Sequence, residues 1–297
     1  MDVRQLGYFV KIAQEESFSE AALRLGVSQP TLSLAIKGLE EELGVKLFYP
    51  FGRKQYLTDS GRRLYTRAQD ILDGFRETYE AVRSGDGELD GTITIGMPPV
   101  VGTCYFTAII ADFKRLHPKL EVRVVEQGAL TIEDMIEEGT IDIACTIGTP
   151  HVYKFGTKDI VAERNVVLVP SGHALAKNQI VSMEELKDEP FAIFNENFVL
   201  HVITVEACKN AGFTPKFAVQ SSQWDFLVEL VREGLAISIL PEPIIRRFPL
   251  PGITCLELDE SAGLLRDWTV LLIWNKNRYF SNACAALLEH VENRFGK

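Results

Sequence analysis

The stretch from Ser17 to Gly44, SFSEAALRLGVSQPTLSLAIKGLEEELG, constrains the fold more than any other part of the chain. Its spacing of apolar residues predicts two short helices, the first capped by Ser19 and the second by Ser28. Gly26 has no Cβ, so it can adopt the left-handed conformation that ends the first helix. The predicted apolar faces carry Ala22, Leu23 and Leu25 in the first helix, and Leu32, Ile36 and Leu39 in the second, with Leu43 one turn further.

The outer face of the second predicted helix carries short polar side chains and one cation. Gln29, Thr31 and Ser33 can reach base edges in a major groove, and Lys37 can reach a phosphate. The pair of helices is typical of a helix-turn-helix, although a plain αα-hairpin in a helical domain would give the same local pattern. The preceding amphipathic segment supplies a third helix for a common core through Leu6, Phe9, Val10 and Ala13.

Two short strands are predicted after Gly44, over residues 45–48 and 55–57. The intervening YPFGRK contains Pro50 and Gly52 as turn formers, followed by Arg53 and Lys54. A basic hairpin beside a recognition helix can act as a wing that touches the sugar-phosphate backbone. A solvated basic loop is the alternative interpretation of the same residues.

A long helix is predicted from about Asp59 to Arg83, with apolar residues spaced by three and four. The stripe comprises Leu64, Ala68, Ile71, Leu72, Phe75, Tyr79 and Val82. This short segment offers no core for the whole stripe, so we expect a partner helix from a second subunit. Packing against the chain's own helical head is the alternative. The glycine-rich, acidic SGDGELDG at 84–91 is predicted to be a linker.

The formal net charge of −10 would be expected to repel nucleic acid, but it is unevenly distributed. Residues 1–83 hold 12 basic and 12 acidic residues, so the rest of the chain carries the whole excess. No nucleophile elbow, P-loop, dinucleotide fingerprint or zinc spacing is present, so neither an enzyme, a cofactor nor a metal is expected. With no secretory signal, no membrane span and five scattered cysteines, we expect a cytoplasmic protein with reduced thiols.

From Thr92 onward, short apolar runs alternate with helical stretches, which predicts a parallel sheet with helices on both faces. The expected strands include 92–97, 120–126 and 141–148, and helices are expected over 103–116 and 131–138. A second block of the same style and the strand 268–274 predict two α/β subdomains, with crossings near 160–162 and 265–267. Ligands of such sheets bind beyond the carboxyl ends of the strands, where helix N-termini favour a small anion.

Taken together, these residues resemble the LysR-type transcriptional regulators. The resemblance rests on SFSEAALRLGVSQPTLSLAIKGLEEELGVKLF, on LTDSGRRLY with its long helix, and on later phrases such as PSGHAL and VREGLAISILPE. It implies an α+β multidomain chain: a winged helix-turn-helix head at 1–58, a dimerising helix and hinge at 59–90, and a periplasmic-binding-protein-like effector domain at 91–297. The subdomains of the last would span about 91–161 with 267–297, and about 162–266.

The resemblance implies a sequence-specific DNA-binding regulator that forms dimers and tetramers, binds operator DNA and responds to a small metabolite. RNA polymerase is a further candidate partner. A metabolite-binding oligomer whose head serves only assembly is the alternative, and it would lack salt-dependent operator binding. The candidate DNA contacts are Ser28, Gln29, Pro30, Thr31, Ser33, Lys37, Arg53 and Lys54. The candidate effector contacts are Pro99, Val100, Thr103, Gly128, Ala129, Thr146, Phe198, His201 and Ser221.

This chain also departs from the family pattern at three places. The wing has Tyr49-Pro50-Phe51 where an arginine is usual, which leaves its phosphate contacts to Arg53 and Lys54. The first effector loop has prolines and valines in place of a hydroxyl, and His201 stands near a usual arginine. The cleft is therefore expected to suit a ligand with an apolar or aromatic part, unless these residues merely line a dry contact between subdomains. A peroxide switch is not expected, because Cys208 has no second cysteine close by in the sequence.

Overall fold

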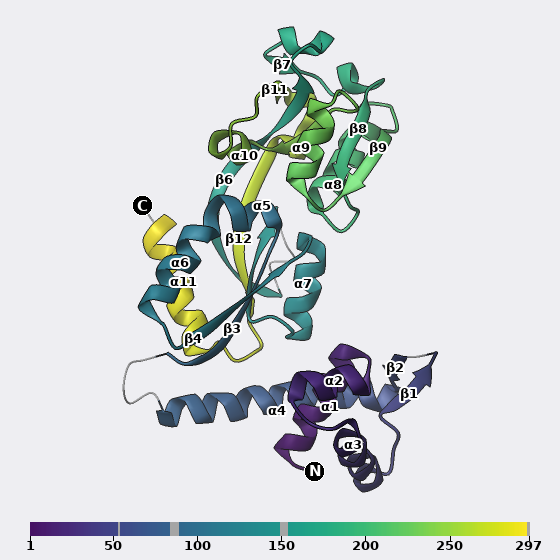
Figure 1. Ribbon diagram of the computed structural model, residues 1–297, viewed down its shortest axis with the longest axis vertical. Coiled ribbons are helices and arrows are strands. Elements are labelled where there is room, and N and C mark those ends of the chain that lie inside the picture. Colours follow the sequence, from purple (N-terminus) through teal and green to yellow (C-terminus); the bar gives the residue numbers. More distant parts are fainter. Residues whose placement is uncertain (53, 84–88, 149–153, 296–297) are drawn as a thin grey trace. The chain divides into compact units, whose positions relative to one another are not determined.

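The computed structural model describes residues 1–52, 54–83, 89–148 and 154–295. The chain forms two compact units: residues 1–87 with 277–281, and residues 88–276 with 282–297. Figure 1 shows the two units as ribbons. Each unit has its own cluster of buried apolar residues. No helix in the described part of the chain is both long enough and apolar enough to cross a membrane.

Three helices form the core of the first unit, which we call the head. They are α1 (Val3–Glu15), α2 (Phe18–Leu25) and α3 (Gln29–Leu43). Gly26 has the predicted positive φ of 65° and ends α2, and Ser28 caps α3. The predicted apolar positions Leu32, Ile36 and Leu39 are all buried, whereas Leu43 is exposed.

Two details of α2 differ from the prediction. The helix is capped by Ser17, whose hydroxyl accepts a hydrogen bond from the Glu20 N–H, and not by Ser19. This earlier start places Phe18 in the first turn, where its ring packs edge-on against Phe48. Consequently the helix buries Ala21 and Ala22, and Leu23 is exposed to solvent.

The wing consists of β1 (Phe48–Phe51) and β2 (Lys54–Leu57), which pair in antiparallel fashion. Residues 45–47, which were predicted to be a strand, precede it instead, because Glu40 reaches across from α3 to the Lys46 ammonium and the Leu47 N–H. Tyr49, Pro50 and Phe51 were expected in the turn but form the strand, with Phe51 opposite Lys54. The first strand of the hairpin therefore lies closer to the turn than predicted.

The long helix α4 (Asp59–Arg83) begins after Thr58, whose hydroxyl accepts a hydrogen bond from the Gly61 N–H. Its apolar stripe is used in two ways. Leu64, Ala68 and Leu72 pack on the core of the head. Ile71, Phe75 and Tyr79 remain 44%, 56% and 54% exposed, so this part of the stripe does not contribute to the core of the head.

An eight-stranded sheet runs through the second unit, in the order β4-β3-β5-β12-β6-β11-β7, with β10 also pairing with β6. The strands β3 (Gly91–Met97), β4 (Leu120–Glu126) and β5 (Ile143–Ile147) are parallel, as predicted. The sheet as a whole is mixed, because β12 (Asp267–Asn275) is antiparallel to both of its neighbours, β5 and β6. We call the part of this unit that contains β3, β4, β5 and β12 lobe I. Its helices are α5 (Pro99–Val101), the π-helical turn η1 (Gly102–Phe106), α6 (Thr107–Leu116), α7 (Ala129–Glu138) and α11 (Asn282–Phe295).

The other part, lobe II, contains the parallel pair β8 (Pro190–Phe194) and β9 (Lys216–Ser221). Helices α8 (Val199–Asn210) and α9 (Trp224–Arg232) pack against this pair, and α10 (Glu242–Arg247) packs against β6 and β10. Its remaining strands are β7 (Ile180–Val181), β10 (Ser238–Pro241) and β11 (Ile253–Leu258), and its short 3-10 helices are η2 (Ala174–Lys177), η3 (Glu184–Leu186) and η4 (Glu260–Arg266).

One strand, β6 (Phe155–Pro170), passes continuously from lobe I to lobe II (Figure 1). Its first part pairs with β12 as far as Arg164, and its second part pairs with β10 from Asn165 onward. The buried Asn165 amide donates hydrogen bonds to the carbonyls of Leu265 and Asp267, at 2.8 and 3.2 Å. Asn165 thus ties the outgoing crossing of the chain to its return crossing.

Candidate functional site

The exposed surface at the start of α3 is held in place by its own side chains. The Ser28 hydroxyl accepts a hydrogen bond from the Thr31 N–H at 3.3 Å and lies 2.7 Å from the Thr31 hydroxyl. The Gln29 amide donates to the Ser33 hydroxyl at 3.2 Å. These contacts restrict the side chains that a base edge would meet, which lowers the entropy cost of binding. Pro30 lies beside them in the first turn.

The cations near this surface are partly neutralised by carboxylates. Lys37 lies 3.7 Å from Glu41, one turn further along α3, and both side chains are exposed. Lys54 at the wing forms an ion pair with Glu16 at the end of α1. This pair raises the pKa of Lys54, mainly through the hydrogen bond to Glu16. Arg53, the other predicted wing contact, lies outside the described residues.

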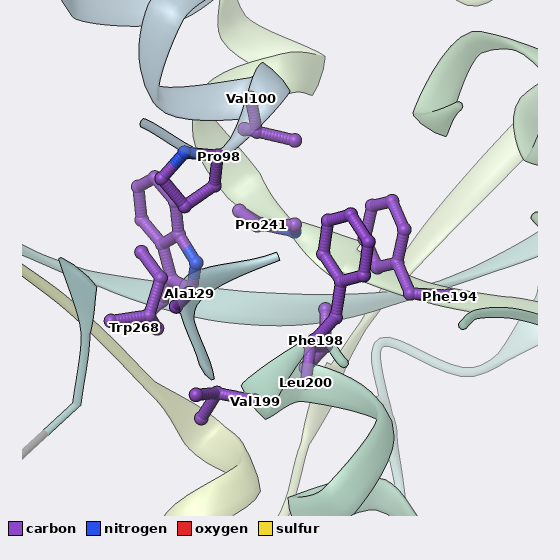
Figure 2. Close-up of a pocket in the computed structure, with 10 residues that line it drawn as sticks. Pro98, Val100, Ala129, Phe194, Phe198, Val199, Leu200, Pro241 and Trp268 are labelled. Atoms are coloured by element: carbon purple, nitrogen blue, oxygen red, sulfur yellow. The ribbon is translucent and has the colours of Figure 1, made fainter. Parts of the chain in front are cut away.

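In the second unit, a narrow apolar pocket lies where lobe I meets lobe II. Its volume is about 350 Å³, including the mouth. The rings of Phe194 and Phe198 stack with centroids 4.7 Å apart. Figure 2 shows them on one side of the pocket, with Pro98, Ala129 and Trp268 on the other. The lining is completed by Val100, Ile147, Val199, Leu200 and Pro241.

A wider and more polar hollow shares Phe198 with this inner pocket. Its volume is about 910 Å³, including the mouth. Two carboxylates, Glu126 and Asp225, and the indole of Trp224 lie on its wall. The other lining residues are Pro99, Thr103, Gln127, Ser222 and Gln223. The two spaces together offer an apolar end and a hydrated end to a small molecule.

Three helices begin at the walls of these spaces: α7 at Ala129, α8 at Val199 and α9 at Trp224. Their N-cap residues are Gly128, Phe198 and Gln223, and none forms a side-chain cap bond within the described structure. Free N–H groups at a helix start attract anions. Gly128 also allows a close approach of the lobes, since a Cβ there would lie 2.2 Å from the Asn197 carbonyl oxygen.

The structure brings together some of the predicted effector residues and separates others. Val100, Ala129 and Phe198 line the inner pocket, and Pro99 and Thr103 line the outer hollow. The remaining predicted residues, apart from Gly128, have their polar groups bonded within the protein. The Thr146 hydroxyl donates to Glu133, the His201 Nδ1 donates to the Phe194 carbonyl at 2.8 Å, and the Ser221 hydroxyl accepts from the Gln223 N–H at 3.1 Å.

Several pocket residues were not expected from the sequence. Trp268 lies near the start of β12 and Pro241 at the end of β10, and both positions depend on the sheet order, since each strand pairs with β6. Trp224 follows a strand end, so the same rule that selected Ser221 could have selected it. Trp268 carried a weaker signal, because it was interpreted only as the first residue of a buried strand.

Close to the pocket, the two lobes are also joined by a polar contact. The Tyr105 hydroxyl in η1 donates to the Glu163 carboxylate on β6 at 2.9 Å. Arg246 on α10 pairs with the same carboxylate. Burial, together with the Glu163 hydrogen bond, raises the pKa of Tyr105. Glu163 therefore holds one residue from each lobe at the crossing.

Residues 3–62 match the model of the bacterial regulatory helix-turn-helix proteins of the lysR family, and residues 86–296 match the LysR substrate binding domain. The chain belongs to the LysR family of transcriptional regulators. It is therefore a DNA-binding regulator with an effector-binding domain. The matched families and relatives are regulators and not enzymes, and nothing among them favours a head that serves only assembly.

The similarity to other LysR-family regulators extends over the whole chain. The HTH-type transcriptional regulator YwbI of Bacillus subtilis is 37% identical, with 99% of this chain and 96% of the relative covered. The transcriptional dual regulator GltC of the same organism is 32% identical, with 100% and 98% covered. The structure of a full-length OxyR variant from Pseudomonas aeruginosa superposes with a TM-score of 0.77 at 26% identity, covering 98% of this chain and 95% of the other.

Proposed function

We propose that this LysR-type regulator binds a small carboxylate with an apolar or aromatic part between lobes I and II. The observation that carries the proposal is the set of uncapped helix starts, at Ala129, Val199 and Trp224, around an apolar pocket. The apolar part would enter between Phe198 and Trp268, and the carboxylate would bind backbone N–H groups. Described lining residues of both spaces include no lysine, arginine or histidine, so the anion depends on the backbone.

We further propose that the domains follow the boundaries expected from the sequence: 1–58 for the winged head, 59–90 for the dimerising helix and hinge, and 91–297 for the effector domain. The head would read operator DNA through the α3 residues from Ser28 to Lys37, and the wing would touch the backbone through Arg53 and Lys54. The exposed Ile71, Phe75 and Tyr79 would pair with a second copy, and effector domains would join two dimers into a tetramer.

Regulation would follow from coupling between the two ends of the chain. Ligand binding would bias the closure of the lobes about the crossing that Asn165 and Glu163 hold together. In a tetramer, such closure would change the angle between pairs of heads, and with it the bend or spacing of the bound half-sites. The protein would act in the cytoplasm, with RNA polymerase as its partner at the promoter.

Thermal unfolding of the full-length protein tests the ligand class. Small aromatic and aliphatic carboxylates, such as benzoate and hexanoate, should raise the unfolding temperature of the effector domain. The matched amides, benzamide and hexanamide, should not, because they carry no charge for the helix starts. If no carboxylate stabilises the protein, or amides and acids do so equally, the anionic-effector proposal is wrong.

A further inference from the structure

An exposed leucine, Leu34, lies in the middle of α3. Its side chain is 70% exposed, whereas the other aliphatic residues near it in the helix, Leu32, Ile36 and Leu39, are all buried. The core of the head is thus complete without Leu34. Single exposed leucines are common on protein surfaces, so exposure alone assigns no role.

The position of Leu34 in the helix is more informative than its exposure. It directly follows Ser33, whose hydroxyl is bonded to Gln29, and it lies three residues before Lys37. Residues three and four apart share a helix face, so Leu34 shares a surface with Pro30 and Lys37. An apolar group therefore lies within the proposed base-reading surface and not beside it.

The major groove of B-DNA presents one apolar group on the base edges, the C5-methyl of thymine. We propose that Leu34 contacts a thymine methyl in each half-site of the operator and thereby selects thymine at that position. This inference rests on the proposed role of α3 in reading DNA. Lys37 is the only lysine or arginine of α3, and Glu41 lies beside it. Apolar contact consequently has a larger share in recognition here than on a strongly basic helix.

A second exposed leucine provides a matched control. Leu23 on α2 is 75% exposed, but α2 is not the helix proposed to read bases. Leu34→Ala and Leu23→Ala remove the same atoms from similarly exposed helix positions. Alanine also has the highest helix propensity, so both variants should fold. Thermal unfolding of each full-length variant checks this.

The experiment has two stages. Full-length wild type, Leu34→Ala and Leu23→Ala each select sites from a random duplex library, and thymines in the wild-type consensus are then replaced singly by deoxyuridine, which lacks only the methyl. Loss of one buried methyl should weaken wild-type binding about fourfold per half-site. Leu23→Ala should show the same loss. Leu34→Ala should show none, and its selected sites should no longer favour thymine at that position.

Two results would overturn the proposal. In one, Leu34→Ala keeps both the thymine preference and the deoxyuridine penalty. In the other, Leu34→Ala weakens binding equally to all sequences with the penalty retained, as loss of a protein–protein contact would. The double variant Gln29→Ala/Ser33→Ala distinguishes a failure of the inference about Leu34 from a failure of the proposal that α3 reads DNA. If it changes the selected sequence while Leu34→Ala does not, only the inference about Leu34 fails.

Discussion

The base-reading surface of α3 and the inner pocket of the effector domain are built in opposite ways. The surface consists of near-consecutive residues on one exposed helix, and its polar groups bond to each other. The pocket is a concave space and gathers residues from Pro98 to Trp268 in the sequence. A shallow surface offers little buried area, so it depends on a second copy for affinity. A concave pocket can bind its ligand within a single chain.

The largest expected effect follows from this dependence of the head on a partner. Phe75→Asp places a charge in the exposed part of the α4 stripe and should dissociate the proposed dimer. Operator affinity should fall by about 100-fold or more because the two half-sites are no longer bound together. Carboxylate binding should remain unchanged. Sedimentation measures dimer formation, fluorescence anisotropy measures operator affinity, and thermal shift measures carboxylate binding. Thr66→Asp, on the opposite face of α4, is the control and should change none of them.

The opposite result, weaker carboxylate binding with unchanged operator affinity, is expected for Phe198→Ala in the pocket. Removal of this buried ring should destabilise the effector domain by about 3–5 kcal/mol and weaken carboxylate binding about tenfold or more. Operator affinity without a ligand should stay within about twofold. Denaturant unfolding and titration calorimetry of the full chain measure these changes. Phe226→Ala, at an exposed position on α9, should leave both stability and ligand binding nearly unchanged.

A smaller effect is expected at the wing. Glu16→Gln removes the carboxylate that pairs with Lys54 and so frees the lysine for phosphate. Affinity should rise about two- to threefold for operator and unrelated DNA alike, and the salt dependence should steepen by about one unit. Anisotropy titrations at several salt concentrations measure both. A change confined to the operator would mean that the wing reads bases and not the backbone.

No effect is expected from peroxide. Burial raises the pKa of Cys104 to about 11 and that of Cys208 to about 12, and it also raises the pKa values of Cys145 and Cys255. Because these values lie above neutral pH, the thiols stay protonated and only alkaline pH would produce the reactive thiolate. Peroxide at pH 7.5 should leave operator affinity unchanged. Rapid thiol oxidation with altered DNA binding would contradict this.

The contrast between the two sites also explains what the sequence could predict. The helix boundaries of α3, its buried face and the turn at Gly26 follow from local spacing and backbone chemistry. The cap of α2 and the strand β1 were misplaced because side-chain contacts between elements, Phe18 with Phe48 and Glu40 with Lys46, decided between local alternatives. Local patterns do not contain such contacts.

Pocket residues were predicted least completely. The strand-end rule selected Val100, Ala129 and Phe198, which line the inner pocket, but it also selected Thr146 and His201, whose side chains bond within the protein. Trp268 and Pro241 enter the pocket because β12 and β10 both pair with β6, and this mixed strand order was not expected from the parallel pattern. The composition of the pocket therefore depends on topology more than on any motif.

The exposed start of α3 is the surface that we propose reads the operator. The most direct test compares the affinity of the full-length protein for its selected operator with its affinity for unrelated duplex DNA at one fixed salt concentration. The wild type should prefer the operator by a factor of about 1,000 or more. Gln29→Ala/Ser33→Ala should bring the ratio close to one while the dimer stays intact. A variant that kept the wild-type ratio would contradict the account.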